Sequence, residues 1–327
     1  MPDALDQPEK ALEASRLTKR YGRLTAVEDV SFSVAPGEIV GFLGPNGAGK
    51  STTLRILAGR LLATSGRASV WGESVALNPA GAKRHLAYMP ENNPLPEELR
   101  VREYLELRAR LKGVDEDMVG LRVDQVMHDC DLRGRATMLI AHLSKGFRQR
   151  VGIADALLAN PRVILLDEPT IGLDPHQILG IRDLLRSLRG RMAVLISSHI
   201  LPEVEQVCDR VVILSRGRIV AQGRPDELRR ELLPAPVHRV VADCPPEEIG
   251  RAVRALDPGA ACAAVGEAEP GWTRFRVSLP PGSPARDRLL AGLVGAGLRV
   301  REVAEEQGGL EEIFLAATRR DPRENRT

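Results

Sequence analysis

The run Gly44-Pro-Asn-Gly-Ala-Gly-Lys-Ser51 constrains the fold of this chain more than any other segment. It fits the spacing G-x-x-x-x-G-K-[ST], follows the apolar residues 39–43 and precedes the helically spaced run LRILAGRLL. Glycines let successive backbone N–H groups converge on phosphate oxygens, and the following helix adds the positive end of its dipole. A plain glycine turn before a helix is the alternative, but chance rarely matches all four positions in a chain with six lysines. The segment therefore predicts a phosphate-binding loop between a strand and a helix.

Two side chains of this loop have chemistry that suits a nucleotide. The Lys50 ammonium is expected to reach the β- and γ-phosphates, and the Ser51 hydroxyl is expected to ligate Mg²⁺. The predicted nucleotide-binding residues of the segment are Gly44, Asn46, Gly47, Gly49, Lys50, Ser51 and Thr52.

A second apolar run, residues 163–166, ends in the adjacent acids Asp167 and Glu168. Ligands of a doubly wound sheet lie at the carboxyl ends of its strands, so both acids are expected beside the phosphate loop. Neighbouring side chains of a strand point to opposite faces. We therefore expect Asp167 in the Mg²⁺ shell and Glu168 as the base that orients and deprotonates water. Solvated acids at a strand end are the alternative, which the phosphate loop disfavours.

A third apolar run, residues 193–196, precedes Ser197-Ser198-His199. The same argument from strand ends places His199 near the γ-phosphate. A single histidine is more often structural, but its position directly after a core strand favours a role in the site. The predicted catalytic residues are thus Lys50, Glu168 and His199.

The order of apolar and polar segments predicts two domains. Residues 16–43 have strand patterns, residues 95–142 are mostly helical, and strands alternate with helices as in an α/β fold with a parallel sheet. The segment LLPAPVH contains two prolines and indicates a linker after residue 233. Beyond it the pattern strand-helix-strand-strand-helix-strand is the order of a split βαβ unit, and a last helix is expected at residues 310–317.

The composition excludes several classes of function. The formal net charge is +2 and aromatic residues make up 3% of the chain, which argues against a protein that coats nucleic acid. The cysteines have no metal-site spacing and are expected as reduced thiols. No apolar run reaches the 18 residues that a membrane-spanning helix needs, and the N-terminus lacks the pattern of a signal peptide. Arginine makes up 40 of the 46 basic residues. Because the arginines are scattered, a genome rich in GC, which favours arginine codons, explains this excess better than phosphate recognition does.

These motifs together resemble the ATP-binding subunits of ABC transporters. Leu143-Ser-Lys-Gly-Phe-Arg-Gln149 is similar to the family's LSGGQ signature and departs from it at Lys145 and Phe147. In the family, the positions of Ser144 and Gly146 bind the γ-phosphate. The serine also suits a helix N-cap, and a capped helix alone is the alternative.

Further residues match the family in order. Tyr21 stands where an aromatic ring stacks on adenine, although a core tyrosine is nearly as good an interpretation. Gly172-Leu-Asp-Pro175 resembles the loop that links the halves of the ATPase dimer, and His199 resembles the switch histidine. Glu91 replaces the usual glutamine and remains a candidate for the Mg²⁺ shell, since its carboxylate accepts but does not donate.

The resemblance implies a domain plan as well as a site. We expect a disordered segment at residues 1–13 and a P-loop NTPase cassette at 14–233, with a parallel-sheet core, an N-terminal antiparallel part and a helical subdomain at about 92–150. A small α+β domain, ferredoxin-like in its element order, is expected at 236–320, followed by a tail at 321–327. The runs PENNPL, LSKGFRQR and GLDPHQ, with Gly309 to Leu315, resemble the gliding-motility-type exporter ATPases that work with type-2 ABC permeases.

The family's mechanism requires a second copy. Two ATPase domains close head to tail, and each ATP lies between the phosphate loop of one copy and the signature of the other. The resemblance therefore implies ATP and Mg²⁺ as cofactors, a homodimer, a separately encoded integral membrane permease and no nucleic acid partner. The chain is expected on the cytoplasmic face of the cell membrane, with permease contacts around residues 94–111 or, alternatively, simple core packing there.

Other ABC classes fit less well. A soluble regulator remains the alternative function. Translation factors of this kind usually carry two cassettes and a long charged linker, whereas this chain has one phosphate loop and one signature. Chromosome-type members separate their motifs by long coiled coils, and no sustained heptads lie between Ser51 and Asp167. A catalytically dead scaffold is disfavoured because the predicted phosphate-binding, metal-binding and catalytic groups are all present.

Overall fold

The computed structural model describes residues 8–233, 237–306 and 309–319 of the 327-residue chain. The chain contacts divide it into two compact units, one that contains the chain up to Pro225 and the residues from Thr318 on, and one that runs from Asp226 to Ala317. Helix α8 (Pro225–Leu232) groups by its contacts with the second unit, so the division comes earlier than the predicted boundary after residue 233. The expected tail at 321–327 lies outside the described residues.

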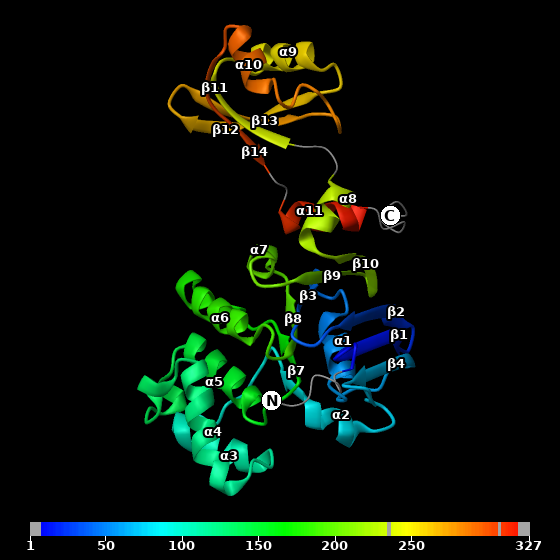
Figure 1. Cartoon of the computed structure of the whole chain (residues 1–327), viewed down its shortest axis with the longest axis vertical. Coiled ribbons are helices and arrows are strands. Elements are labelled where there is room, and N and C mark those ends of the chain that lie inside the picture. The colour runs from blue at the N-terminus through cyan, green and yellow to red at the C-terminus, as the bar shows by residue number, and fades with distance from the viewer. Residues whose placement is uncertain (1–7, 234–236, 307–308, 320–327) are drawn as a thin grey trace. The chain divides into compact units, whose positions relative to one another are not determined.

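The first unit contains a six-stranded sheet in the order β10-β9-β3-β8-β7-β6 (Figure 1). From β9 to β6 all neighbours are parallel, while β10 is antiparallel to β9. Every residue of β3, β7 and β8 is buried, which accounts for their apolar character on both faces. The predicted parallel core is confirmed. Its strands are β3 (Ile39–Leu43), β6 (Leu86–Met89), β7 (Val163–Asp167), β8 (Ala193–Ser198), β9 (Arg210–Ser215) and β10 (Arg218–Gly223).

The register of this sheet brings the three predicted motifs to one edge. Leu43, the last residue of β3, pairs with Ser198 of β8, and Asp167 of β7 pairs with Ser197. Because parallel strands share a direction, the loop after β3, the acids at the end of β7 and the histidine after β8 leave the sheet together.

A second sheet of the first unit is antiparallel, with the order β2-β1-β4-β5. Its side chains join those of β3 and helix α1 (Lys50–Leu57) in one hydrophobic cluster that includes Leu17, Phe42 and Leu54. The strands are β1 (Leu12–Tyr21), β2 (Leu24–Val34), β4 (Ser65–Val70) and β5 (Glu73–Ser74).

The N-terminal prediction needs a correction. Strand β1 begins at Leu12, and Ala11 and Leu12 are fully buried, so the expected disorder does not extend over residues 11–13. Pairing of Leu12 with Val34 and Val70 orders this end of the chain. Residues 1–7 lie outside the described part of the chain.

Helices α3, α4 and α5 lie together as the expected helical subdomain (Figure 1). Asp155 of α5 accepts a hydrogen bond from Arg108 Nε at 2.9 Å and lies 3.1 Å from Lys112 Nζ, which ties α3 to α5. Burial and the nearby Asp155 raise the pKa of Tyr104 to about 12. The helices of the first unit are α1 (Lys50–Leu57), α2 (Pro79–His85), α3 (Val101–Leu111), α4 (Glu116–Asp129), α5 (Lys145–Leu157), α6 (Pro175–Leu188) and α7 (Leu201–Glu205), with single 3-10 turns at η1 (Arg133–Arg135) and η2 (Ile140–His142).

The second unit has the predicted β-α-β-β-α-β order. Its antiparallel sheet has the order β12-β13-β11-β14, which is the ferredoxin-like topology. Phe275 and Val277 of β13 pack in one cluster with Ile249 of helix α9 and Leu293 of helix α10. The elements after α8 are β11 (Val237–Asp243), α9 (Pro246–Leu256), β12 (Ala261–Glu269), β13 (Trp272–Ser278), α10 (Leu289–Gly295), β14 (Arg299–Glu306) and α11 (Leu310–Arg319).

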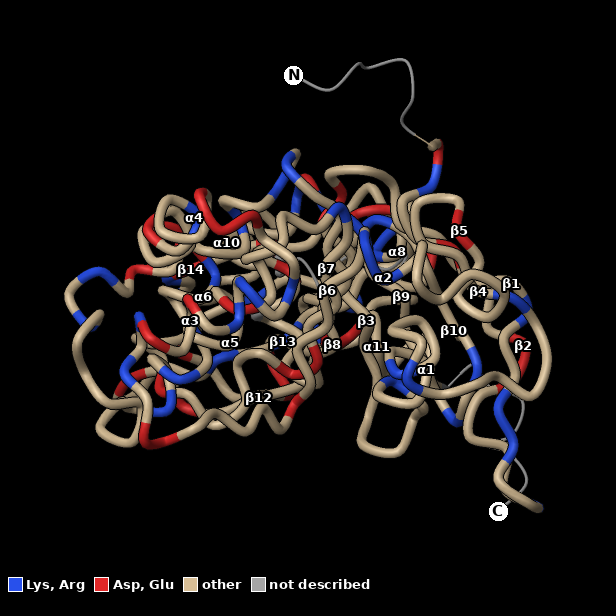
Figure 2. Tube along the Cα trace, turned by 90° about the horizontal axis from the view of Figure 1, so that it is seen from below, with Lys and Arg blue, Asp and Glu red and all other residues tan. Residues whose placement is uncertain are grey.

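Charges of both signs are interspersed along the coloured part of the trace (Figure 2). This pattern agrees with the net charge of +2 and with the scatter of arginines in the sequence. In the parts of the chain that the structure describes, no helix is both long and apolar enough to cross a bilayer.

Candidate functional site

The glycine loop curls between β3 and α1 as its sequence predicts. Gly49 is the N-cap residue of α1 and has φ +104°, a conformation that side-chain-bearing residues rarely adopt. A Cβ at Gly49 would lie 2.6 Å from the carbonyl oxygen of Ala26. Glycine is therefore required here by both backbone conformation and space, and the loop closes tightly onto the start of α1.

Lys50 occupies the centre of the site although it carries a charge. Its side chain is 6% exposed, and Nζ donates a hydrogen bond to the carbonyl oxygen of Gly44 at 2.7 Å. The same Nζ lies 3.4 Å from Oε1 of Glu168. A buried ammonium needs such partners, because an unpaired charge away from water is strongly disfavoured.

Asp167 and Ser51 meet across the loop, as predicted for a metal site. Oδ1 of Asp167 accepts hydrogen bonds from Ser51 Oγ at 3.2 Å and from Ser197 Oγ at 2.6 Å. Carboxylate and hydroxyl oxygens are the hard ligands that Mg²⁺ prefers, so this pair fits the ion. Glu91, the third predicted ligand, is exposed and lines a cavity together with Ser51, whereas Asp167 is buried and is not among the residues that line it.

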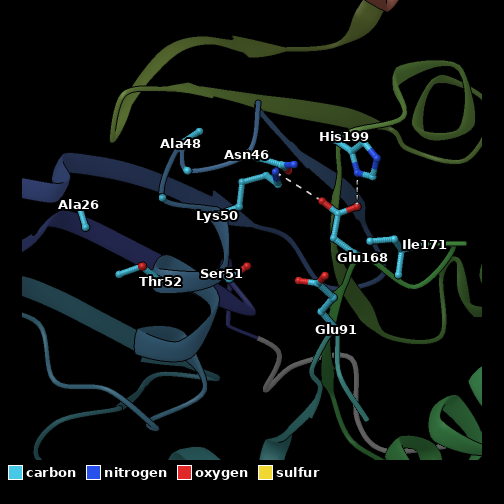
Figure 3. Close-up of a pocket in the computed structure, with 12 residues that line it drawn as sticks. Ala26, Asn46, Ala48, Lys50, Ser51, Thr52, Glu91, Glu168, Ile171 and His199 are labelled. Carbon is cyan, nitrogen blue, oxygen red and sulfur yellow. Dashed lines mark hydrogen bonds and ion pairs between the residues drawn. The ribbon is translucent and has the colours of Figure 1, made fainter.

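Glu168 is held between two basic groups. Figure 3 shows its carboxylate between Lys50 and His199, and Nδ1 of His199 lies 2.8 Å from Oε2 of Glu168. A carboxylate can only accept a hydrogen bond, so Nδ1 carries the hydrogen in this pair. The backbone of Glu168 has φ +50°, an unusual value for a residue with a side chain. Its N–H donates to Ser197 Oγ at 2.9 Å, which helps to hold this strained conformation.

These groups open onto one cavity of about 380 Å³ (Figure 3). Figure 3 shows Lys50 and the loop residues Asn46 and Ala48 on one side, facing Glu91 and Glu168 on the other. Such a polar, concave site suits a phosphate chain with a divalent cation. The lining residues are Ala26, Asn46, Gly47, Ala48, Gly49, Lys50, Ser51, Thr52, Glu91, Glu168, Ile171 and His199.

Four predicted nucleotide contacts do not line this cavity. One is Gly44, whose carbonyl oxygen instead accepts the hydrogen bond from Lys50 Nζ. The other three are Tyr21, Ser144 and Gly146. The side chain of Tyr21 is 48% exposed, with the Lys19 ammonium 5.2 Å from its ring centre. Ser144 caps α5, because its Oγ accepts a hydrogen bond from the N–H of Phe147 at 3.4 Å. Gly146 is buried in the first turn of the same helix. None of the three lines the cavity of their own chain.

Two residues that the motifs did not predict also contact the site. Ser197 bonds both Asp167 and the backbone of Glu168, and the Tyr88 hydroxyl lies 3.4 Å from Asp167 Oδ2. Burial and the charge of Asp167 raise the pKa of Tyr88, so its hydroxyl keeps its proton. For Ser197 a signal existed in the sequence, since it stands at the end of the third core strand.

Known proteins share this architecture. A family model described as ABC transporter matches residues 27–171. YhcH of Bacillus subtilis, an uncharacterized ABC transporter ATP-binding protein, is 41% identical over 213 residues, 64% of this chain and 68% of the relative. Nod factor export ATP-binding protein I of Mesorhizobium japonicum is 32% identical over 319 residues, 96% of this chain and 88% of the relative. A solved ATP binding subunit of an ABC transporter aligns with TM-score 0.62 and 37% identity over 68% of this chain and 92% of its own.

Proposed function

The chain belongs to the family of ABC transporter ATP-binding proteins, and from this we propose that it hydrolyses ATP as the motor subunit of an exporter. The observation that carries the proposal is the position of Glu168. Its carboxylate lies between Lys50 and His199 in the cavity of the phosphate loop. A carboxylate so placed is well suited to act as a base toward a water molecule next to a terminal phosphate.

Each group has a distinct part in the proposed reaction. The loop N–H groups and Lys50 bind the phosphates, so that Lys50 exchanges its contact with Glu168 for phosphate oxygens. Ser51 and Asp167 would hold Mg²⁺, which supplies charge neutralisation between the phosphates. Glu168 is then free to accept a proton from water, while the Nδ1–H of His199 keeps its carboxylate oriented. Ser197 holds both neighbouring acids, because its hydroxyl bonds the carboxylate of Asp167 and the backbone N–H of Glu168.

A second copy of the chain is part of the proposal. Ser144 and Gly146 lie outside the cavity of their own chain, at the first turn of α5. That helix start offers free N–H groups and a positive dipole end to an anion. In a head-to-tail homodimer they would contact the nucleotide held by the partner's loop, and Tyr21 would stack on its base.

The output of the motor is proposed from its relatives. Two of them are named ABC transporter or export ATP-binding proteins, and the second of these matches nearly the whole chain. We infer that this chain drives a separately encoded integral membrane permease, and that it works at the cytoplasmic face of the cell membrane. Closing and reopening of the ATPase dimer would shift the permease between two conformations.

Isolation from the native membrane tests the coupling. The tagged full-length chain should co-purify with an integral membrane protein, and the pair in lipid vesicles should hydrolyse ATP faster than the chain alone. Lys50→Ala in the same pair serves as the nucleotide-binding control. If the tagged chain instead co-purifies with ribosomes, or if the membrane protein does not change its rate of ATP hydrolysis, the result would support a regulator that acts without a permease.

A further inference from the structure

Gly180 is unusual for a glycine, because it lies inside helix α6 rather than at its end. Glycine is a poorer helix former than alanine, so a glycine inside a helix needs a structural reason. A Cβ built on Gly180 would lie 2.1 Å from Nη2 of Arg150. The guanidinium of Arg150 thus fills the space that any side chain at position 180 would need.

Arg150 joins three elements of the first unit. Its side chain, on α5, is only 16% exposed. Nη1 donates hydrogen bonds to the carbonyl oxygen of Cys130 at 3.0 Å and to Oδ2 of Asp131 at 3.3 Å, directly after α4. The guanidinium carbon also lies 6.0 Å from the ring centre of Phe147. Arg150 therefore holds α5 to the end of α4 and, through Gly180, to α6.

Two neighbouring contacts repeat this close approach. A Cβ at Gly172 would lie 2.3 Å from Nζ of Lys145, the first residue of α5. A Cβ at Gly146 would lie 2.7 Å from Cδ of Gln177 in α6. The first turns of α5 are therefore packed closely against the segment 172–180 at three successive places.

The two packed segments serve different parts of the proposed ATPase. The start of α5 carries Ser144 and Gly146, which would contact a nucleotide bound by the second copy. The segment 172–180 follows the loop that leaves Glu168, which would act on the nucleotide of its own copy. The side chains of Arg150, Lys145 and Gln177 lie between the two segments, and the hydrogen bonds of Arg150 to Cys130 and Asp131 hold its guanidinium in place there.

We propose that Arg150 is a positioning residue, which fills the space above Gly180 and so fixes the first turns of α5 for contact with the second copy's nucleotide. The proposal rests on the proposed function, because it requires that ATP brings two copies together. Arg150 does not line the cavity of its own chain, so its effect on that cavity is indirect.

Gly180→Ala tests this idea directly, with Gly120→Ala in α4 as its matched control. Both positions lie inside a helix, but a Cβ at Gly120 meets nothing within 4 Å. Both variants are made in full-length protein carrying Glu168→Gln, which should collect ATP-bound dimers. Dimer formation is measured by analytical ultracentrifugation against ATP concentration, and monomer binding of a fluorescent ATP analogue is measured separately.

The two substitutions should differ in one readout only. Gly180→Ala displaces the flexible end of Arg150, so the ATP concentration for half-maximal dimer should rise about fivefold or more, within the usual range of coupling between sites. Its monomer nucleotide affinity should match that of the parent, as for Gly120→Ala. Its melting temperature should stay close to the parent's, because the gain in helix propensity offsets the hydrogen bonds that the displaced guanidinium loses. Added to Arg150→Met, Gly180→Ala should have no further effect, because the guanidinium it displaces is already gone.

Two results would overturn the inference. Equal dimer formation in Gly180→Ala and Gly120→Ala would show that the contact does not position the helix. A further loss when Gly180→Ala is added to Arg150→Met would show that Gly180 acts without Arg150. A Glu168→Gln parent that stays monomeric in ATP would contradict the proposed function itself, and this inference would fall with it.

Discussion

Ser197 is the residue on which both acids of the site depend. Its buried hydroxyl donates to Oδ1 of Asp167 at 2.6 Å and accepts from the N–H of Glu168 at 2.9 Å. The first bond orients a proposed metal ligand, and the second helps to hold the proposed base at φ +50°. One small side chain thus sets the geometry of two carboxylates with different roles.

We expect Ser197→Ala to lower the rate of ATP hydrolysis about 10- to 100-fold, the usual effect of losing a group that orients a site's ligands. The free energy of unfolding should fall by about 0.5–1.5 kcal/mol, because two hydrogen bonds of the Ser197 hydroxyl are lost while the Glu168 N–H keeps the backbone carbonyl oxygen of Ser197 at 3.2 Å. Ser198→Ala is the control, since Ser198 Oγ accepts from the N–H of Ile200 and touches neither acid. A Ser197→Ala rate equal to that of Ser198→Ala would refute this role.

Motif spacing predicted the central residues of the site but not their supports. Lys50, Ser51, Asp167, Glu168 and His199 are brought together as expected, because each follows a core strand whose end is visible in the sequence. Tyr88 and Ser197 were not predicted as site residues, although Ser197 stands at the end of the same core strand that precedes His199. The sheet register places their hydroxyls on Asp167. The roles of Tyr21, Ser144 and Gly146 stay predictions.

Among the elements, the presence of the core strands was predicted more accurately than the residues at which strands begin and end. The apolar runs gave β3, β7 and β8, because strands buried on both faces have unmistakable composition. Strand β1 begins earlier than expected, since its first residues, 12–14, pair on both sides with β2 and β4. Such pairing is a tertiary effect that the local pattern does not contain.

Strand β11 of the second unit contains a buried histidine that should make the unit sensitive to acid. His238 is 5% exposed, and its Nε2 has no hydrogen-bond partner among the described residues. Burial lowers the pKa of His238 and outweighs the raising effect of Glu305, while Arg286 lowers it further. The neutral form is therefore favoured in the folded state.

The sign of the pH effect follows from this lowered pKa. Below about pH 6.5 the unfolded chain binds a proton at His238 more readily than the folded chain, so the second unit should lose stability as the pH falls. Urea unfolding at pH 5.5 and 7.5, followed by Trp272 fluorescence in a Trp71→Phe background, measures the difference in the free energy of unfolding between the two pH values. It should shrink in His238→Leu but persist in the control His128→Leu, whose histidine is exposed. An unchanged difference in His238→Leu would exclude this histidine as its cause.

For the whole molecule, the sequence motifs identified the family and the two-part organisation. Family membership confirms the resemblance that rested on the phosphate loop and the altered signature. The gliding-motility subgroup stays a prediction, because the relatives described above carry other names. The match to a Nod factor export protein extends over 319 residues, so it reaches into the ferredoxin-like unit as well as the cassette. That unit could be predicted from its element order, but its role could not, since it carries no motif with known chemistry.

Phosphate release by the purified full-length chain, with and without Glu168→Gln, measures the proposed ATPase at its decisive residue. We expect release that requires ATP and Mg²⁺, and a rate about 10²- to 10⁴-fold lower in Glu168→Gln, because the variant retains nucleotide binding but lacks a base. Affinity for ATP, measured by equilibrium binding, should stay within about threefold of the parent, since the loop and Lys50 are intact. Equal rates in the two proteins would contradict the assignment of Glu168 as the base that activates water.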